Sequence, residues 1–192
     1  MLSTSNDEQL AVEDRILDAA ASCLLALGVE RVTLAAIARR AGVSRPTVYR
    51  RWRDSRSVIA ALLTARVTDA WTEVTVPGAG REALVERIVA VAARLRRDEV
   101  VMQVLHHAPE LAMVYITERM GASQQRLIDL VAAELGTAQV GGGVRPGDPR
   151  GLAAMCLLIT QSAIQSAQLV APILDEAALA AELSYALNRY LS

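Results

Sequence analysis

The sequence predicts an all-α fold of about nine helices. Hydrophobic residues make up 53% of the 192 residues but aromatic residues only 3%, and Phe is absent. The apolar content is therefore mostly Ala, Leu, Val and Ile, and the first two are strong helix formers. Apolar residues recur every three or four positions through most of the chain, and Gly, Pro and capping residues separate these segments.

Three helices are predicted in the first third of the chain. The first spans Val12–Leu27, where apolar residues share one face. The second begins at Thr33, whose hydroxyl can cap free backbone N–H groups, and ends at Gly42, which can adopt the positive φ of a sharp turn. The third follows a second cap at Ser44 and has Pro46 in its first turn. Two short helices joined by a tight glycine turn are typical of a helix-turn-helix.

The third predicted helix carries a basic face. Val48 and Trp52 lie four residues apart and are expected to face inward, while the other positions hold mostly polar and basic side chains. Arg31–Arg56 contains eight arginines and one acid, Asp54, for a local net charge of +7, although the whole chain has a net charge of −1. This imbalance on a helix that fits the major groove favours nucleic-acid binding. The alternative is a helical hairpin whose arginines only keep it in solution.

These helices resemble the N-terminal domain of TetR-family transcriptional regulators. The resemblance lies within Ile16–Leu63, on the segments ILDAAASCLLALG, VTLAAIARRAGVSRPTVYRRW and SRSVIAALL. It implies that Thr33 and Tyr49 contact phosphates, and that base edges are contacted by Arg45, Pro46 and Thr47. Arg50 and Arg51 would contact a phosphate or a base edge. Ser44 would cap the recognition helix.

The chain departs from the TetR pattern at two positions. Many members have a Lys at the start of the fourth helix, where this chain has Ser55. Arg53 or Arg56 could replace that Lys, and Ser55 still offers a hydroxyl at a helix N-terminus. Some relatives also have an Arg where this chain has Ala35.

Residues 57–192 are predicted to form a helical body behind a DNA-binding domain of residues 10–56. The helix that begins near Asp148 is apolar on more than one side, because Leu157 and Leu158 lie off its main stripe. A partner is therefore expected to cover it. The resemblance implies that the last two helices pair with their copies in a homodimer. Such a twofold dimer would bind a pseudo-palindromic operator in double-stranded DNA.

The resemblance also implies that the body binds a small-molecule effector, which releases the protein from DNA. No motif marks the lining of this pocket. Helical spacing alone selects the candidates Trp71, Met102, His106, Met113, Tyr115 and Gln161. Few charges lie on the inner stripes, so the ligand is expected to be apolar or modestly polar. Ordinary core or surface placement is the alternative for each candidate.

The sequence offers little for other classes of function. His106 and His107 are the only histidines, and adjacent residues do not chelate one metal as residues four apart would. No nucleotide-binding or nucleophile motif is present, so neither a cofactor nor catalysis is expected. Without a signal peptide or a long apolar run, the protein is expected in the cytoplasm. The sequence thus predicts a ligand-released repressor. The alternatives are a DNA-binding regulator without a small effector and a small helical enzyme.

Overall fold

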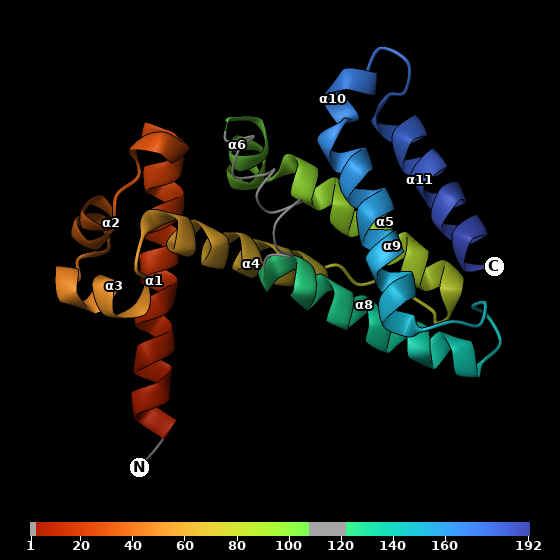
Figure 1. Cartoon of the computed structure of the whole chain (residues 1–192), viewed down its shortest axis with the longest axis horizontal. Helices are drawn as coiled ribbons and strands as arrows, with labels where there is room; N and C mark the ends of the chain where they lie inside the picture. The colour runs from red at the N-terminus through yellow and green to blue at the C-terminus, as the bar shows by residue number, and fades with distance from the viewer. Residues whose placement is uncertain (1–2, 108–121) are drawn as a thin grey trace. The chain divides into compact units, whose positions relative to one another are not determined.

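The computed structural model describes the backbone of residues 3–107 and 122–192, and the side chains of residues 10–107 and 124–192. These residues form ten α-helices and one 3₁₀ turn, and no strand occurs among them (Figure 1). The all-α prediction is therefore confirmed. The elements are α1 (Ser3–Leu27), η1 (Val29–Arg31), α2 (Leu34–Ala41), α3 (Arg45–Arg51), α4 (Ser55–Glu73), α5 (Arg81–Arg97), α6 (Glu99–His107), α8 (Ala122–Val140), α9 (Pro149–Gln165), α10 (Ala167–Val170) and α11 (Glu176–Leu191).

The helices form two compact units. Among the described residues, the first unit contains those up to Ala65 together with α6, and the second contains Arg66–Asp98 and Ser123–Ser192. The single helix α4 therefore contributes to both units. The boundary predicted between residues 56 and 57 separates an expected DNA-binding domain from an expected ligand-binding body. It is not the boundary between the two compact units, and it stays a prediction.

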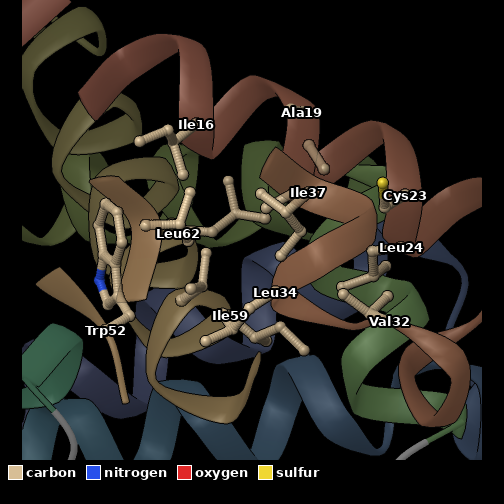
Figure 2. Packing of buried hydrophobic residues seen from close by; sticks show 14 of the residues in the cluster. Ile16, Ala19, Cys23, Leu24, Val32, Leu34, Ile37, Trp52, Ile59 and Leu62 are labelled. Atoms are coloured by element: carbon tan, nitrogen blue, oxygen red, sulfur yellow. The ribbon is translucent and has the colours of Figure 1, made fainter. Parts of the chain in front are cut away.

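The first unit is built around one cluster of apolar side chains, which Figure 2 shows from close by. The cluster draws residues from α1, α2, α4 and α6, from α3 and from Trp52 directly after it. Its fully buried members, at 0% exposure, are Ile16, Ala20, Leu24, Ile37, Val48 and Val58. Because these residues lie on the inner faces of their helices, α2 and α3 are held by one side only and keep the opposite side exposed.

The second unit is built on α5, α9 and α11, which pack against one another. The sequence predicts one apolar stripe in α5, formed by Leu84, Ile88, Val91 and Leu95, and these residues are buried with exposed fractions of 6% or less. α11 buries the same kind of stripe, formed by Leu179, Leu183, Leu187 and Leu191. Both stripes repeat every three or four residues, as the sequence predicted for helices with one inner face.

Arg87 fixes the end of α4 to α5 and α8 within the second unit. Its Nη1 donates to Oε1 of Glu134 at 2.6 Å, and its Nη2 donates to the carbonyl of Trp71 at 2.7 Å. The guanidinium also lies 4.3 Å from the centroid of the Trp71 ring. Trp71 is only 4% exposed, so the last turns of α4 are held by apolar burial, a cation–π contact and charge-assisted hydrogen bonds.

Two helix boundaries differ from the expected ones. α1 begins at Ser3 rather than at Val12, because no Gly or Pro interrupts the preceding polar stretch and a helix can extend beyond its buried face. The sequence predicts that the helix starting at Pro149 continues through Ala167, but it ends at Gln165. Ser166 leaves helical geometry with a ψ of 1°, and α10 then forms a separate short helix. The sequence also predicts a helix from Glu110 to about Leu135, and its expected start lies outside the described residues.

Candidate nucleic-acid interface

A side-chain cap fixes the start of α2 and of α3. Oγ1 of Thr33 accepts a hydrogen bond from the N–H of Ala36 at 3.2 Å, and Oγ of Ser44 accepts one from the N–H of Thr47 at 3.3 Å. Between the helices, Gly42 has a φ of 66° and a ψ of 31°, a left-handed conformation that glycine adopts at little cost. Both predicted caps and the predicted glycine turn are confirmed, so the sequence defines the angle at which α3 leaves α2.

The recognition helix α3 buries one side and presents the other. Val48 is 0% exposed and Trp52 is 8% exposed, as the sequence predicted. Tyr49 is 53% exposed, and the other exposed side chains of the helix are Arg45, Pro46 and Arg50. The structure thus brings four of the predicted contact residues together on one short helix. Their contact with DNA stays a prediction.

Three of the predicted contact residues, Thr33, Ser44 and Thr47, already have partners for their hydroxyl groups within the protein. Oγ1 of Thr47 lies 2.7 Å from Oγ of Ser44, and Thr47 is half-buried. The Thr33 hydroxyl accepts the capping bond of α2. A hydroxyl can donate one bond and accept two, so each group keeps capacity for a further partner.

Arg51 differs from the other two basic residues of α3. Its Nη1 donates to Oε2 of Glu13 on α1 at 3.1 Å, and its side chain is only 22% exposed. Arg45 and Arg50 are exposed by contrast. The guanidinium of Arg51 is therefore engaged by the protein itself, and the predicted contact between Arg51 and DNA competes with this ion pair.

The start of α4 is closed by a reciprocal pair of hydrogen bonds. Oδ1 of Asp54 accepts from the N–H of Ser57 at 2.8 Å, and Oγ of Ser57 accepts from the N–H of Asp54 at 3.4 Å. Arg53, which is 91% exposed, donates to Oδ2 of Asp54 at 3.1 Å. The predicted contact residue Ser55 is half-buried in this turn, and Arg56 is exposed beside it. Both arginines that could replace the missing Lys thus lie at the same helix start.

The Asp54 carboxylate gives a testable dependence of stability on pH. The hydrogen bond from the Ser57 backbone holds the pKa of Asp54 below its usual value of 3.8. A lowered pKa in the folded state means that this cap stabilises the protein above pH 3.8, and that its contribution is lost as the pH falls through the folded pKa. We expect Asp54→Ala to lower the free energy of unfolding by about 0.5–2 kcal/mol at neutral pH.

Urea unfolding of both proteins over a pH series measures this effect. The difference between wild type and Asp54→Ala should shrink on acidification, whereas Asp54→Asn, which keeps an acceptor but does not titrate, should retain a cap. An Asp54→Ala difference that is the same at neutral and acid pH would contradict the assignment.

Sequence reasoning missed three residues that shape this surface. Asp54 and Ser57 had a signal, because an acceptor followed by a polar residue three positions later is typical of a capping box. Glu13 had none, since it lies 38 residues from Arg51 and only the packing of α3 near α1 brings the two together.

The ligand candidates that the structure describes are divided between the two units. Trp71 and Gln161 belong to the second unit, and Met102 and His106 belong to the first. Trp71 is buried against Arg87, the amide of Gln161 accepts from Gln124 at 3.3 Å, and His106 is exposed. Met113 and Tyr115 lie outside the described residues. The set therefore stays an untested prediction.

Two surface pockets are lined entirely by described residues of the second unit. One, of about 780 Å³, lies over the loop between α8 and α9, and the other, of about 290 Å³, lies beside the last turns of α11. None of the six ligand candidates lines either pocket. In the part of the chain that the structure describes, no helix is long and apolar enough to cross a bilayer. Among the same residues, no group of three or more His, Cys, Asp or Glu side chains could hold a metal ion.

The chain resembles known proteins in both sequence and structure. The family of bacterial regulatory proteins named tetR matches residues 16–62. An uncharacterized HTH-type transcriptional regulator of Mycobacterium tuberculosis is 61% identical over 191 residues, which cover 100% of both chains. The TetR-family repressor QsdR of Rhodococcus erythropolis has a similar structure, with a TM-score of 0.65 at 18% identity over 94% of each chain. RolR in complex with resorcinol gives a TM-score of 0.64 at 14% identity over 97% of this chain and 90% of its own.

The fold and the surface around α3 define a class of protein, the helix-turn-helix regulators of transcription, which bind DNA. Within that class, the chain belongs to the tetR family of bacterial regulatory proteins.

Proposed function

We propose that the protein is a homodimeric repressor whose α3 helix enters the major groove of a pseudo-palindromic operator. The observation that carries this proposal is the exposed side of α3, where Arg45, Tyr49 and Arg50 are exposed while Val48 and Trp52 are buried. Arginine can donate two parallel hydrogen bonds to O6 and N7 of guanine, and the methyl group of Thr47 suits thymine. Thr33, Ser55 and Tyr49 are proposed to bind phosphates around this face.

The dimer is proposed to form through α9 and α11. Met155 and Leu158 are 41% and 54% exposed, lie three residues apart on α9 and therefore share one side of that helix. Tyr185 on the adjacent helix α11 is 60% exposed. Apolar side chains on two neighbouring helices are favoured at an interface between subunits. A twofold axis would place two α3 helices about 34–36 Å apart, one turn of DNA.

Release by a small, apolar or modestly polar ligand is the proposed mode of control, in a protein that acts in the cytoplasm and is not an enzyme. α4 runs as one helix through both units, and Arg87 holds its last turns. The protein would have two states that differ in the placement of α4. A ligand that binds one of these states more tightly than the other would shift the populations toward it. A metabolite that stabilises the protein against heat and also weakens DNA binding would support this control. DNA binding that no stabilising metabolite alters would favour the regulator without a small effector.

Selection of bound duplexes from a random-sequence library tests the proposed DNA binding. We expect the wild-type protein to enrich one sequence with approximate twofold symmetry, in which the half-sites lie about one helical turn or a multiple of it apart. Enrichment of no common sequence at moderate salt would overturn the proposal.

A further inference from the structure

We propose that Glu13 is a positioning residue for the recognition helix, and that it acts through Arg51, which faces the protein rather than DNA. This inference deepens the proposed function, since it requires α3 to be the helix that enters the groove. It also divides the three arginines of α3 into two exposed ones that meet DNA and one that orients the helix.

The contact between the two side chains spans elements that are far apart in sequence. Nη1 of Arg51 and Oε2 of Glu13 are 3.1 Å apart, within hydrogen-bonding distance, and they join the last turn of α3 to α1. The side chain of Arg51 is 22% exposed and that of Glu13 is 43% exposed. The pair is therefore partly shielded from solvent, which strengthens a charge-assisted hydrogen bond relative to one in open water.

The apolar anchors of α3 restrain its rotation about the line through Val48 and Trp52 only weakly. The helix has seven residues, and its anchors Val48 and Trp52 are separated by one turn along a single side. Two anchors on one line hold the helix against the core but offer little resistance to rotation about that line. Arg51 lies on the flank of this line, so its bond to Glu13 opposes the rotation.

This rotation matters for sequence recognition rather than for attraction to DNA. Binding side chains must be held within about 10–20° of their productive orientation, and a roll of α3 would carry Arg45 and Thr47 away from the base edges. Attraction to phosphates tolerates such a change, because it depends on charge rather than on fixed geometry. Loss of the pair should therefore reduce the preference for the operator more than the affinity for random DNA.

A charge exchange separates positioning from direct contact. The proteins to compare are wild type, Glu13→Arg, Arg51→Glu and the exchanged double variant Glu13→Arg/Arg51→Glu. Each is titrated with the duplex that the wild type selects from a random library and with a random duplex of equal length. We expect each single variant to lose on the order of tenfold in preference for the selected duplex, because like charges then face each other. The double variant should return to within about twofold of wild type, since it restores the pair.

Arg50→Gln and Arg51→Gln form a matched pair of controls on the same helix. Arg50→Gln should lower affinity for both duplexes and reduce the slope of log K against log salt by about one, because we assign to Arg50 the phosphate contact, one of the two contacts that the resemblance implies for it. Arg51→Gln should leave that slope unchanged and reduce only the preference for the selected duplex, by about two- to fivefold. Circular dichroism and thermal unfolding verify that every variant is folded at the assay temperature.

Two results would overturn the inference while leaving DNA binding intact: a double variant as weak as Arg51→Glu, or an Arg51→Gln protein with the reduced salt slope of Arg50→Gln. Either would assign Arg51 to direct contact. A wild-type protein that selects no sequence would instead overturn the proposed function, and the positioning role with it.

Discussion

Trp52→Ala is expected to lower the free energy of unfolding of the first unit by about 3–5 kcal/mol, the largest stability effect of any substitution near α3. Trp52 is 8% exposed and lies in the cluster that includes Ile16, Ile37 and Leu62 (Figure 2). Its removal leaves a cavity at the point where α1, α2 and α4 share their core. The backbone N–H of Trp52, which donates to the carbonyl of Val48 at 3.0 Å, is kept in the variant, so the loss comes from the side chain.

The two tryptophans of the chain allow this loss to be assigned to one unit. Trp52 belongs to the first unit and Trp71, buried at 4% exposure, to the second. In Trp52→Ala, the fluorescence of Trp71 reports on the second unit alone, while circular dichroism reports on all helices. We expect denaturant titration to show an early loss of helix that Trp71 fluorescence does not follow. Arg53→Ala, a neighbour that is 91% exposed, should change little, and equal stability of the two variants would contradict the packing described for Trp52.

The double substitution Thr47→Ala/Tyr49→Phe is expected to give the second large effect, on binding rather than on folding. The lost base contact of Thr47 costs about 1–3 kcal/mol and Tyr49 loses its phosphate contact as well, so the affinity for the selected duplex should fall tenfold or more. Tyr49 is 53% exposed and Thr47 half-buried at the edge of the core. Removal of two hydroxyl groups and one methyl group at such positions should leave the fold and the proposed dimer intact. Fluorescence anisotropy measures the affinity, and sedimentation measures the dimer.

The same chemical changes elsewhere in the chain control for nonspecific effects. Thr137→Ala/Tyr190→Phe removes equivalent groups from the second unit, where the Thr137 hydroxyl donates only to a carbonyl of its own helix. Its DNA affinity should equal that of wild type. If Thr47→Ala/Tyr49→Phe also binds as wild type does, the hydroxyl groups of α3 make no contact that matters, and recognition depends on the arginines alone.

The elements of this surface were predictable because their signals are local. Thr33, Gly42 and Ser44 each act on a backbone group within a few residues, so capping and turn chemistry alone locate α2 and α3. The inward positions Val48 and Trp52 followed from helical spacing in the same way. The family resemblance then assigned a role to the exposed residues between them, which spacing by itself does not do.

The features that escaped prediction depend on packing between distant segments. The bond between Arg51 and Glu13 exists because α3 ends near α1, and nothing around either residue in the sequence marks it. The interaction of Arg87 with Trp71 and Glu134 joins three helices and is equally invisible to periodicity. The start of α1 was missed for the opposite reason, since a solvated helical extension has no inner face to create a pattern.

The central claim is that the exposed face of α3 recognises a DNA sequence, and equilibrium binding as a function of salt tests it most directly. The wild-type protein is titrated with the DNA upstream of its own gene and with a scrambled duplex of the same composition, between about 50 and 200 mM salt. The structure predicts binding to the upstream DNA about a thousandfold or more tighter, with log K falling linearly with log salt for both duplexes. Equal affinity for the two duplexes, or an affinity that does not change with salt, would contradict it.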